Sequence, residues 1–316
     1  MQNSVTPALR TAVIGTGYLG KFHAQKYAAI DGCTLVAVAD ANPDTARAIA
    51  DPLNTRAVSD YRELLGEVDA VSIATPTRTH FEVASAFLAA GVHVLVEKPV
   101  TVTPEEAAAL VKLAAEKQCV LQVGHLERFN TALRAVEDKI DQPLFIESHR
   151  LAPFTPRGAD VNVVLDLMIH DIDIILSIVR SDVADIQASG ATVISDATDI
   201  ANARLTFANG CVANVTASRI SDKQERRMRL FQKNRYIAVD FLTNQTKVCE
   251  TTGTASAEEG LPGIHCEDNQ LQKGDAILAE ISAFCEAIRE AKAPLVSGED
   301  GLRALETATR ISALLS

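Results

Sequence analysis

Residues 11–20 read Thr-Ala-Val-Ile-Gly-Thr-Gly-Tyr-Leu-Gly, an apolar run that leads into three spaced glycines. The spacing Gly-x-Gly-x-x-Gly between a strand and a helix is typical of dinucleotide-binding domains. Gly15 permits the tight turn, Gly17 lets the backbone approach a pyrophosphate, and Gly20 lets helix and strand pack closely. The N-terminus of the following helix attracts the phosphate charge. The residues of this loop that we expect at the cofactor are Gly15, Gly17, Tyr18, Leu19 and Gly20.

The second predicted strand ends at Asp40, where an acidic residue suits a dinucleotide site. A carboxylate at this place can accept hydrogen bonds from both ribose hydroxyls of NAD. Because no Arg directly follows Asp40, the 2′-phosphate of NADP would meet a negative group with no obvious partner. The expected cofactor is therefore NAD. A glycine-rich turn in an unrelated α/β fold is the alternative.

The first part of the chain alternates short apolar runs with helical patterns, which predicts βαβ units and a buried parallel sheet. The predicted strands are Thr11–Ile14, Leu35–Ala39, Ala70–Ala74, Val92–Val96 and Val120–Val123. The predicted helices are Leu19–Ile30, Pro43–Asp51, Thr79–Ala90 and Pro104–Lys117. We expect residues 1–123 to form an NAD-binding Rossmann domain of the α/β class.

Residues 124–316 are expected to form a second, α+β domain with an open, mostly antiparallel sheet. A long apolar helix is predicted at Val161–Val179, and Asn209-Gly210 and Lys233-Asn234 are typical of hairpin turns. The predicted strands are Val183–Val193, Asp199–Phe207, Cys211–Ser218, Arg226–Phe231 and Tyr236–Phe241. Thr251–Gly274 is polar and is predicted as a surface loop. The closing helices, predicted at Ala276–Glu290 and Glu299–Leu315, could pack back on the first domain.

Composition excludes several classes of protein. The 316 residues predict about two domains, and a net charge of −11 argues against nucleic acid as a partner. No apolar run is long enough for a membrane helix, and the first residues lack the layout of a signal peptide. The six cysteines include no Cys-x-x-Cys pair, so we expect reduced thiols and a cytoplasmic location. With no Trp, a sugar platform of stacked indoles is excluded.

Polar residues follow two neighbouring strands of the predicted parallel sheet. Val92–Val96 continues into Glu97-Lys98-Pro99, and the previous strand ends in Ala74-Thr-Pro-Thr77. Ligands of open parallel sheets bind outside the carboxyl ends of the strands, so Lys98 is expected at the cofactor edge. In a closed apolar site a lysine can exchange a proton near neutral pH. An isolated lysine at a strand end is more often a solvated charge.

The long predicted helix of the second domain carries Asp166 and His170, four residues apart and therefore on one face. Asp173 lies one further turn along. Two ligands are too few for a metal site, so no metal is expected. A histidine has a suitable pKa for taking a proton from a hydroxyl. The alternative is a core histidine whose hydrogen bonds are satisfied within the fold.

Three motifs in this order resemble the Gfo/Idh/MocA oxidoreductases: Gly15–Gly20, Ala74-Thr-Pro-Thr-Arg-Thr-His80 and Glu97-Lys-Pro99. The resemblance covers nearly the whole chain. It implies a Rossmann domain joined to an α+β domain, and oxidation of a sugar or cyclitol hydroxyl with NAD(P). It also implies that Glu97 contacts the cofactor ribose and that Lys98 acts in proton transfer. The other implied cofactor contacts are Thr75, Pro76 and His80.

The same resemblance implies that His170 takes the hydroxyl proton, while Asp166 binds substrate or orients the imidazole. Gly124–Asn130 is similar to a stretch in the family's nucleotide-sugar branch. The substrate-binding residues expected from it are Lys98, Arg128, Asn130, Arg157, Asp166 and His170. Further candidates for a diphosphate are Arg150, Arg157 and Arg219. Each of these arginines, taken alone, is more often a solvated surface charge.

For activity, the resemblance implies oxidation of the 3-hydroxyl of UDP-N-acetylglucosamine, after which an aminotransferase would convert the keto sugar for a modified lipid A. The alternatives are the corresponding UDP-sugar uronic acid, an inositol or free sugar, and a non-catalytic NAD-binding regulator. The presence of Lys98, Asp166 and His170 favours an enzyme. An open sheet with a broad apolar face would make the protein a homodimer or homotetramer.

Overall fold

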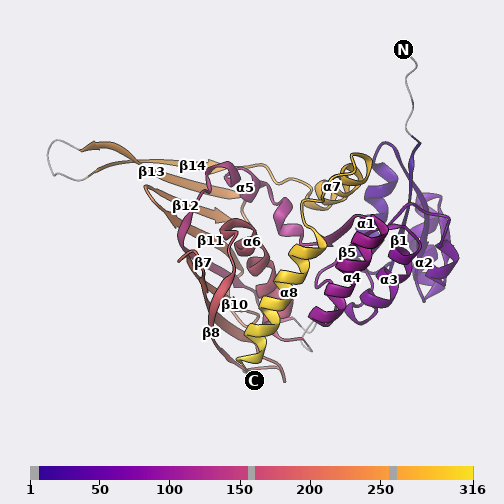
Figure 1. Cartoon of the computed structure of the whole chain (residues 1–316), viewed down its shortest axis with the longest axis horizontal. Coiled ribbons are helices and arrows are strands. Elements are labelled where there is room, and N and C mark those ends of the chain that lie inside the picture. Colours follow the sequence, from indigo (N-terminus) through magenta and orange to yellow (C-terminus); the bar gives the residue numbers. More distant parts are fainter. Residues whose placement is uncertain (1–6, 156–160, 256–261, 316) are drawn as a thin grey trace, which may run out of the picture. The chain divides into compact units, whose positions relative to one another are not determined.

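A computed structural model describes residues 7–155, 161–255 and 262–315 (Figure 1). The described chain divides into two compact units. The first unit takes residues from 1–126 and 275–302, and the second takes residues from 127–274 and 303–316. The boundary therefore lies close to the expected one at residue 123, but a segment near the C-terminus belongs with the first unit. Each unit is described by itself below.

The first unit is built on a six-stranded parallel sheet in the order β3-β2-β1-β4-β5-β6. Its strands are β1 Leu9–Ile14, β2 Cys33–Ala39, β3 Arg56–Val58, β4 Ala70–Ile73, β5 His93–Glu97 and β6 Leu121–Gly124. The parallel sheet predicted from the apolar runs is confirmed. Only β3 was missed, because three residues are too few to show a pattern.

The helices of the first unit follow the predicted positions closely. They are α1 Tyr18–Ala29, α2 Pro43–Ala50, α3 His80–Ala89, α4 Pro104–Lys117 and α7 Ala276–Arg289, while α8 Gly298–Ala313 crosses the unit boundary. Short 3-10 turns lie at Asp51–Leu53, Tyr61–Leu64, Thr77–Thr79, Leu126–Phe129 and, in the second unit, Glu137–Lys139. The start of α4 is fixed by a capping box in which Thr103 and Glu106 exchange hydrogen bonds.

Helix α7 belongs to the first unit because its apolar stripe is buried there. Ile281, Phe284 and Cys285 are fully buried in one cluster with Val13 and Tyr27. These residues form one apolar stripe along the helix, while Leu278 lies off it and is exposed. An ion pair between Lys26 Nζ and Asp275 Oδ2, 2.5 Å long, fixes the start of the helix against α1.

The second unit contains an eight-stranded sheet in the order β14-β13-β12-β11-β7-β10-β9-β8. Its strands are β7 Pro143–Leu151, β8 Val183–Ala191, β9 Ile200–Phe207, β10 Val212–Ser218, β11 Glu225–Gln232, β12 Arg235–Asp240, β13 Gln245–Ala255 and β14 Pro262–Gln270. Every pair is antiparallel except β7 with β10. The open, mostly antiparallel sheet is therefore confirmed, together with the hairpin turns at Asn209-Gly210 and Lys233-Asn234.

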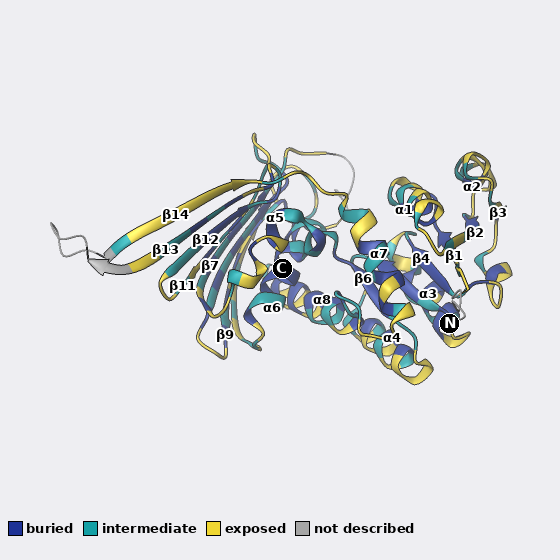
Figure 2. Ribbon diagram, turned by 90° about the horizontal axis from the view of Figure 1, so that it is seen from above, coloured by how far each residue is buried: buried dark blue, intermediate teal, exposed yellow. Residues whose placement is uncertain are grey.

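Two strands replace the surface loop that was expected at Thr251–Gly274. The sequence pattern did not indicate β13 and β14, because their residues are largely polar. Both strands lie at one end of the sheet, where many of their residues are exposed (Figure 2). A disulfide between Cys249 and Cys266 joins them. The expectation that all six cysteines are reduced is therefore wrong for this pair.

The strand at the centre of the sheet, β7, was also missed. Its inward positions include Ile146, Ser148 and Arg150, all buried. Because two of these three side chains are polar, the strand lacks the alternation of apolar and polar residues that predicts a half-buried strand. Burial here depends on hydrogen bonds made to a helix that lies elsewhere in the sequence.

One face of the sheet is covered by helices and holds the core of the second unit. The helices are α5 Thr131–Arg134, a π-helical turn at Val164–Met168, α6 Ile169–Val179 and the end of α8. Ile172 and Ile175 of α6 lie in one apolar cluster with Val215 of β10 and Ile311 of α8. The predicted helix at Val161–Val179 thus begins later than expected and starts with a wider turn.

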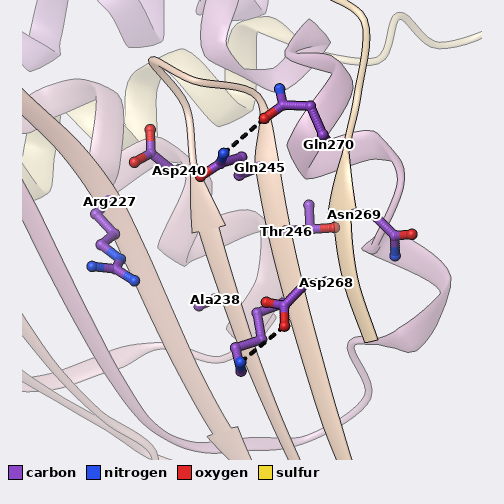
Figure 3. Close-up of a pocket in the computed structure, with 9 residues that line it drawn as sticks. Arg227, Ala238, Asp240, Gln245, Thr246, Asp268, Asn269 and Gln270 are labelled. Atoms are coloured by element: carbon purple, nitrogen blue, oxygen red, sulfur yellow. Dashed lines mark hydrogen bonds and ion pairs between the residues drawn. The ribbon is translucent and has the colours of Figure 1, made fainter. Parts of the chain in front are cut away.

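The opposite face of the sheet carries several charged and polar side chains. Ion pairs join Arg229 to Glu147 at 3.0 Å and Lys247 to Asp268 at 3.0 Å. A polar hollow of about 480 Å³ lies on β11–β14. Figure 3 shows the residues that line it, with the side chain of Gln245 hydrogen-bonded to Gln270 on the neighbouring strand. The same face also carries the neighbouring rings of Phe145, Phe231 and Tyr236, so polar and aromatic side chains share it. The broad apolar interface expected from the sequence stays a prediction. No helix in the described ranges is long and apolar enough to cross a membrane.

Candidate active site

The glycine loop after β1 has the geometry that each glycine was expected to allow. Gly15 has φ +90°, and a Cβ there would lie 2.7 Å from the carbonyl carbon of Ala74. A Cβ on Gly20 would lie 1.8 Å from the Gly15 oxygen, so helix and loop are packed as closely as backbone allows. A Cβ on Gly17 would meet nothing within 4 Å. Backbone atoms therefore pack tightly against Gly15 and Gly20, whereas the space beside Gly17 is open.

Gly17 also begins helix α1, and it leaves the positive end of that helix to a ligand. In the described chain no side chain caps this terminus, and its first turn contains no acidic residue. Peptide N–H groups and the helix dipole at such a terminus attract a phosphate. The open space at Gly17 and the uncompensated helix end fit the pyrophosphate of NAD.

Asp40, which follows β2, is bound to the glycine loop. Its Oδ2 accepts hydrogen bonds of 2.8 Å from both the backbone N–H and the hydroxyl of Thr16. Its Oδ1 accepts a 2.9 Å bond from the N–H of Asn42. A carboxylate has about four lone-pair sites, so it keeps capacity for ribose hydroxyls. The structure thus places Asp40 beside the loop that would hold the pyrophosphate, as predicted.

His80 connects the two polar segments that follow β4 and β5. The imidazole is buried, with Nδ1 at 3.0 Å from the Pro99 oxygen and Nε2 at 2.9 Å from the Thr75 oxygen. A further bond of 2.9 Å joins the hydroxyls of Thr79 and Thr75. Both ring nitrogens of His80 are engaged by the protein. His80 therefore supports the segments that carry Thr75, Pro76 and Lys98, and the cofactor contact expected for it stays a prediction.

Glu97, at the end of β5, belongs to a cluster that the sequence did not reveal. Its Oε1 lies 3.1 Å from Nε2 of His23, which is buried on α1. Ligand atoms of His23, Glu97 and Glu280 all lie within 4.8 Å of one another. Glu280 is buried on α7, and its Oε1 has no hydrogen-bond partner in the part of the chain that the structure describes.

The electrostatics of this cluster centre on Glu280. Burial raises the pKa of Glu280 well above its usual range, and the nearby charge of Glu97 raises it further. Burial and the neighbouring Glu97 therefore both favour the neutral form of the Glu280 carboxyl group. One imidazole nitrogen and two carboxylate oxygens could equally hold a divalent cation of the zinc type. A single acidic residue within the apolar stripe of α7 was the signal that could have pointed to this cluster.

In the second unit, Asp166 lies in the π-helical turn Val164–Met168 and His170 in the first turn of α6. Both side chains are half-buried. The π turn is wider than an α turn, so the spacing of Asp166 and His170 along the helix differs from that of a regular α-helix, and their pairing stays a prediction. Single π turns occur frequently at functional sites, because they change the direction of side chains within a helix.

Arg128 reaches the same helix from the segment before α5. Its Nη1 lies 3.4 Å from Oδ1 of Asp173, three residues beyond His170. Neighbours at i, i+3 share a helix face, so Arg128 lies on the side of α6 that carries His170. Asn130 caps α5 and donates a 3.3 Å bond to the Phe241 oxygen, which makes it a structural residue in this unit.

Two of the candidate arginines for a diphosphate are committed to the fold. Arg150 is buried, with Nε 2.5 Å from Asp171 and Nη1 2.9 Å from Glu127. Arg219 is buried as well, 2.9 Å from Asp199. Neither is a solvated surface charge, because each is held in a buried ion pair. Arg157 lies outside the described residues.

Comparisons with known proteins agree with this geometry. A family model described as the oxidoreductase family with NAD-binding Rossmann fold matches residues 9–125, and a GFO/IDH/MocA C-terminal domain matches residues 131–238. The chain is 43% identical to a UDP-N-acetylglucosamine 3-dehydrogenase of Acidithiobacillus ferrooxidans, over 96% of each chain. A solved structure of that enzyme matches with a TM-score of 0.91 over 97% of each chain. A myo-inositol 2-dehydrogenase of Thermotoga maritima is 26% identical over 94% of this chain and 93% of its own.

The first prediction concerns Asp40. Replacement by Ser removes the acceptor for the ribose hydroxyls, and hydrogen bonds to charged groups contribute about 1.5–3 kcal/mol. Asp40→Ser should weaken NAD binding by about tenfold or more and leave NADP binding less affected, as measured by calorimetric titration. Asp44→Ser, at an exposed carboxylate on the following helix, is the matched control and should leave the binding of both cofactors unchanged. Equal losses of NAD and NADP in Asp40→Ser would contradict the assignment.

The second prediction concerns Glu280. Above pH 4.5, the ordinary pKa of a glutamate, the unfolded chain releases this proton while the folded protein keeps it. Between pH 4.5 and the raised pKa of the folded protein, each unit of increase in pH lowers the free energy of unfolding by about 1.4 kcal/mol. Glu280→Gln carries no such proton, so urea unfolding should show it more stable than wild type at pH 8, with the difference shrinking toward pH 5.

Glu286→Gln, on the exposed side of the same helix, is the control for the Glu280 experiment and should show no comparable pH dependence. A bound cation would give the opposite sign. Glu280→Gln would then lose a ligand and become less stable than wild type, and a chelator would lower the stability of the wild-type protein.

Proposed function

The chain belongs to the Gfo/Idh/MocA oxidoreductases, and we propose that it oxidises the 3-hydroxyl of UDP-N-acetylglucosamine with NAD to give the 3-keto sugar. The observation that carries this proposal is the extended likeness, in sequence and fold, to a UDP-N-acetylglucosamine 3-dehydrogenase. The inositol dehydrogenases are much more distant relatives. Supporting evidence comes from the first unit, whose glycine loop and Asp40 fit NAD.

NAD, when bound, supplies the chemistry of accepting a hydride from the carbon that carries the hydroxyl. The chain would hold it with the backbone of Gly15–Gly20 and with Asp40 at the adenosine ribose. Thr75, Pro76, Glu97 and Lys98 would line the nicotinamide half, at the carboxyl ends of β4 and β5. The buried His23 holds the Glu97 carboxylate through its Nε2, 3.1 Å away.

The hydroxyl oxygen must lose its proton as the hydride leaves, and we assign this step to His170 and Lys98. His170 is half-buried on α6, and histidine is the side chain type that most often accepts a proton near neutrality. Asp166, in the π turn, would bind the sugar or orient the imidazole. Lys98 would hold the hydroxyl or pass on the proton. These roles follow the family motif, residue by residue.

The diphosphate needs cations other than Arg150 and Arg219, because both of these are held in buried ion pairs. Arg128, whose partner Asp173 lies on the helix of His170, is the described arginine that we propose for substrate, and Arg157 stays a proposal of the same kind. The proposed role of Asn130 in substrate binding is weakened by its function as a helix cap.

Three further properties are part of the proposal. The keto sugar is a substrate for amine transfer, so an aminotransferase in a pathway to a modified lipid A would act next. The protein would work in the cytoplasm. It would assemble as a homodimer or homotetramer, and the polar ion pairs on the open sheet face imply an interface rich in hydrogen bonds and charges if that face is used.

The third prediction tests the substrate. NADH formation should occur with UDP-N-acetylglucosamine, in the presence of an amine-transferring enzyme that removes the keto product. Inositol and free hexoses should give little turnover, because the nucleotide provides binding energy that orients the sugar. Turnover of inositol with UDP-N-acetylglucosamine inert would overturn the substrate, and a preference for the uronic acid would move the assignment to that sugar.

The fourth prediction tests the proton-transfer residues. Lys98→Ala and His170→Ala should each lower kcat by about 10²–10⁴-fold, the usual contribution of a positioned acid or base. NAD affinity should change little. Matched controls are Lys112→Ala and His149→Ala, both exposed, which should leave kcat unchanged. If the Lys98 and His170 variants keep near-wild-type turnover, the assignment of proton transfer to these residues is wrong.

A further inference from the structure

Two cysteine thiols from distant parts of the sequence meet in the first unit. Cys33 is the first residue of β2, and Cys285 lies on α7, 252 residues later. Their sulfur atoms are 3.4 Å apart. A disulfide bond requires about 2.05 Å, so only a small closing movement of the two side chains separates this thiol pair from a bond.

Arg289, one helical turn after Cys285, holds a positive charge against Cys33. Its Nη2 donates hydrogen bonds to Cys33 Sγ at 3.4 Å and to the Asp31 oxygen at 3.2 Å. Gly32, directly before Cys33, has φ +76°, and a Cβ there would lie 2.9 Å from Nη2 of Arg289. The absence of a side chain at Gly32 therefore makes room for the guanidinium beside the sulfur.

The two thiols differ in charge and in access to solvent. The hydrogen bond from Cys285, together with the charge of Arg289, lowers the pKa of Cys33 to about 7. Cys285 is fully buried and its pKa is raised, first by its bond to Cys33 and then by burial. The remaining ionisable group facing both sulfurs is Tyr27 of α1, whose pKa burial raises well above its usual value. Cys33, which is half-buried, thus carries the thiolate.

We propose that Cys33 and Cys285 form a modification site, a dithiol that reacts with hydroperoxides and closes to a disulfide. Cys33 is the attacking thiol, because it is the partly exposed one and lies beside Arg289. Cys285 is the resolving thiol, held at 3.4 Å in an apolar cluster. The site is independent of the proposed dehydrogenase reaction.

The chemistry balances in two steps. The Cys33 thiolate attacks one oxygen of the hydroperoxide, a sulfur–oxygen bond forms and the oxygen–oxygen bond breaks, so that sulfur is oxidised to a sulfenic acid. The leaving oxygen takes a proton from solvent to give water or an alcohol. Cys285 then attacks the Cys33 sulfur, the disulfide bond forms, and the hydroxyl leaves with the Cys285 proton as water. A dithiol reductant restores both thiols.

A bond at this place would tie α7 to β2. The chain leaves the first unit at residue 126 and returns to it at residue 275, so α7 is held there by packing and by ion pairs such as Lys26 with Asp275. A covalent link across 252 residues removes much of the freedom of the unfolded chain. Oxidation should therefore raise the unfolding temperature.

Cys119 provides a matched control within the same unit. It is half-buried like Cys33, but its Sγ is directed to the Lys117 oxygen at 3.6 Å, and burial raises its pKa. A thiol with an unshifted or raised pKa is mostly protonated at pH 6.5 and reacts slowly. The contrast between Cys33 and Cys119 isolates the effect of Arg289 and Cys285 from that of exposure.

The fifth prediction is tested on the full chain by brief alkylation at pH 6.5, followed by peptide mapping. Cys33 should be alkylated about fivefold faster than Cys119, since a larger thiolate fraction is partly offset by lower nucleophilicity. Arg289→Gln should reduce this difference, because it removes the positive charge beside Cys33 but leaves the Cys285 hydrogen bond. Because Arg289 is exposed, the variant is expected to fold.

In the second arm, hydrogen peroxide should produce a peptide pair linked through Cys33 and Cys285, distinguished by mapping from the Cys249–Cys266 disulfide. The midpoint of thermal unfolding should rise by about 5 °C in the wild type and not in Cys285→Ser. Equal alkylation of Cys33 and Cys119, or oxidation of Cys33 to a sulfinic acid without the link, would overturn the proposal.

Discussion

The first unit depends on a backbone-to-backbone approach that only glycine permits. A Cβ on Gly20 would lie within bonding distance of the Gly15 oxygen, and a Cβ on Gly15 would collide with the backbone of Ala74. Because these contacts hold β1, β4 and α1 together, they also set the place of the open helix terminus at Gly17 and of Asp40 beside it. The same close glycine contacts thus set both the open helix terminus at Gly17 and the packing of the sheet.

Buried ionisable groups are a second feature of the molecule, and the two units accommodate them differently. In the second unit, Arg150 is neutralised by Asp171 and Glu127, which binds the central strand of the sheet to α6. In the first, Glu280 has no such cation, so burial favours its neutral form beside Glu97. A buried ion pair adds specificity more than stability, because desolvation offsets most of the attraction. In the second unit, the buried ion pair of Arg150 with Asp171 therefore fixes α6 against the central strand β7.

Sequence reasoning failed where burial involved polar side chains. The central strand β7 was missed because Ser148 and Arg150 occupy inward positions, and their hydrogen bonds to Asp171 cannot be read from local periodicity. The strands β13 and β14 were missed for the opposite reason, since an exposed end of a sheet needs no apolar alternation. Glu280 escaped notice because its partners, His23 and Glu97, come from segments that are far away in the chain.

The sequence by itself determined the parallel sheet, the glycine loop and the acid at Asp40, because a strand, a tight turn and a helix start are decided by neighbouring residues. It also indicated His170 and Lys98 by motif. Only the tertiary structure decided which arginines are paired with buried carboxylates. It also decided that Asp166 lies in a π turn just before His170, and that α7 brings Cys285 next to Cys33. The physical reason is that solvation and pairing of charged or reactive groups depend on atoms distant in sequence, whereas backbone conformation is chiefly a local property.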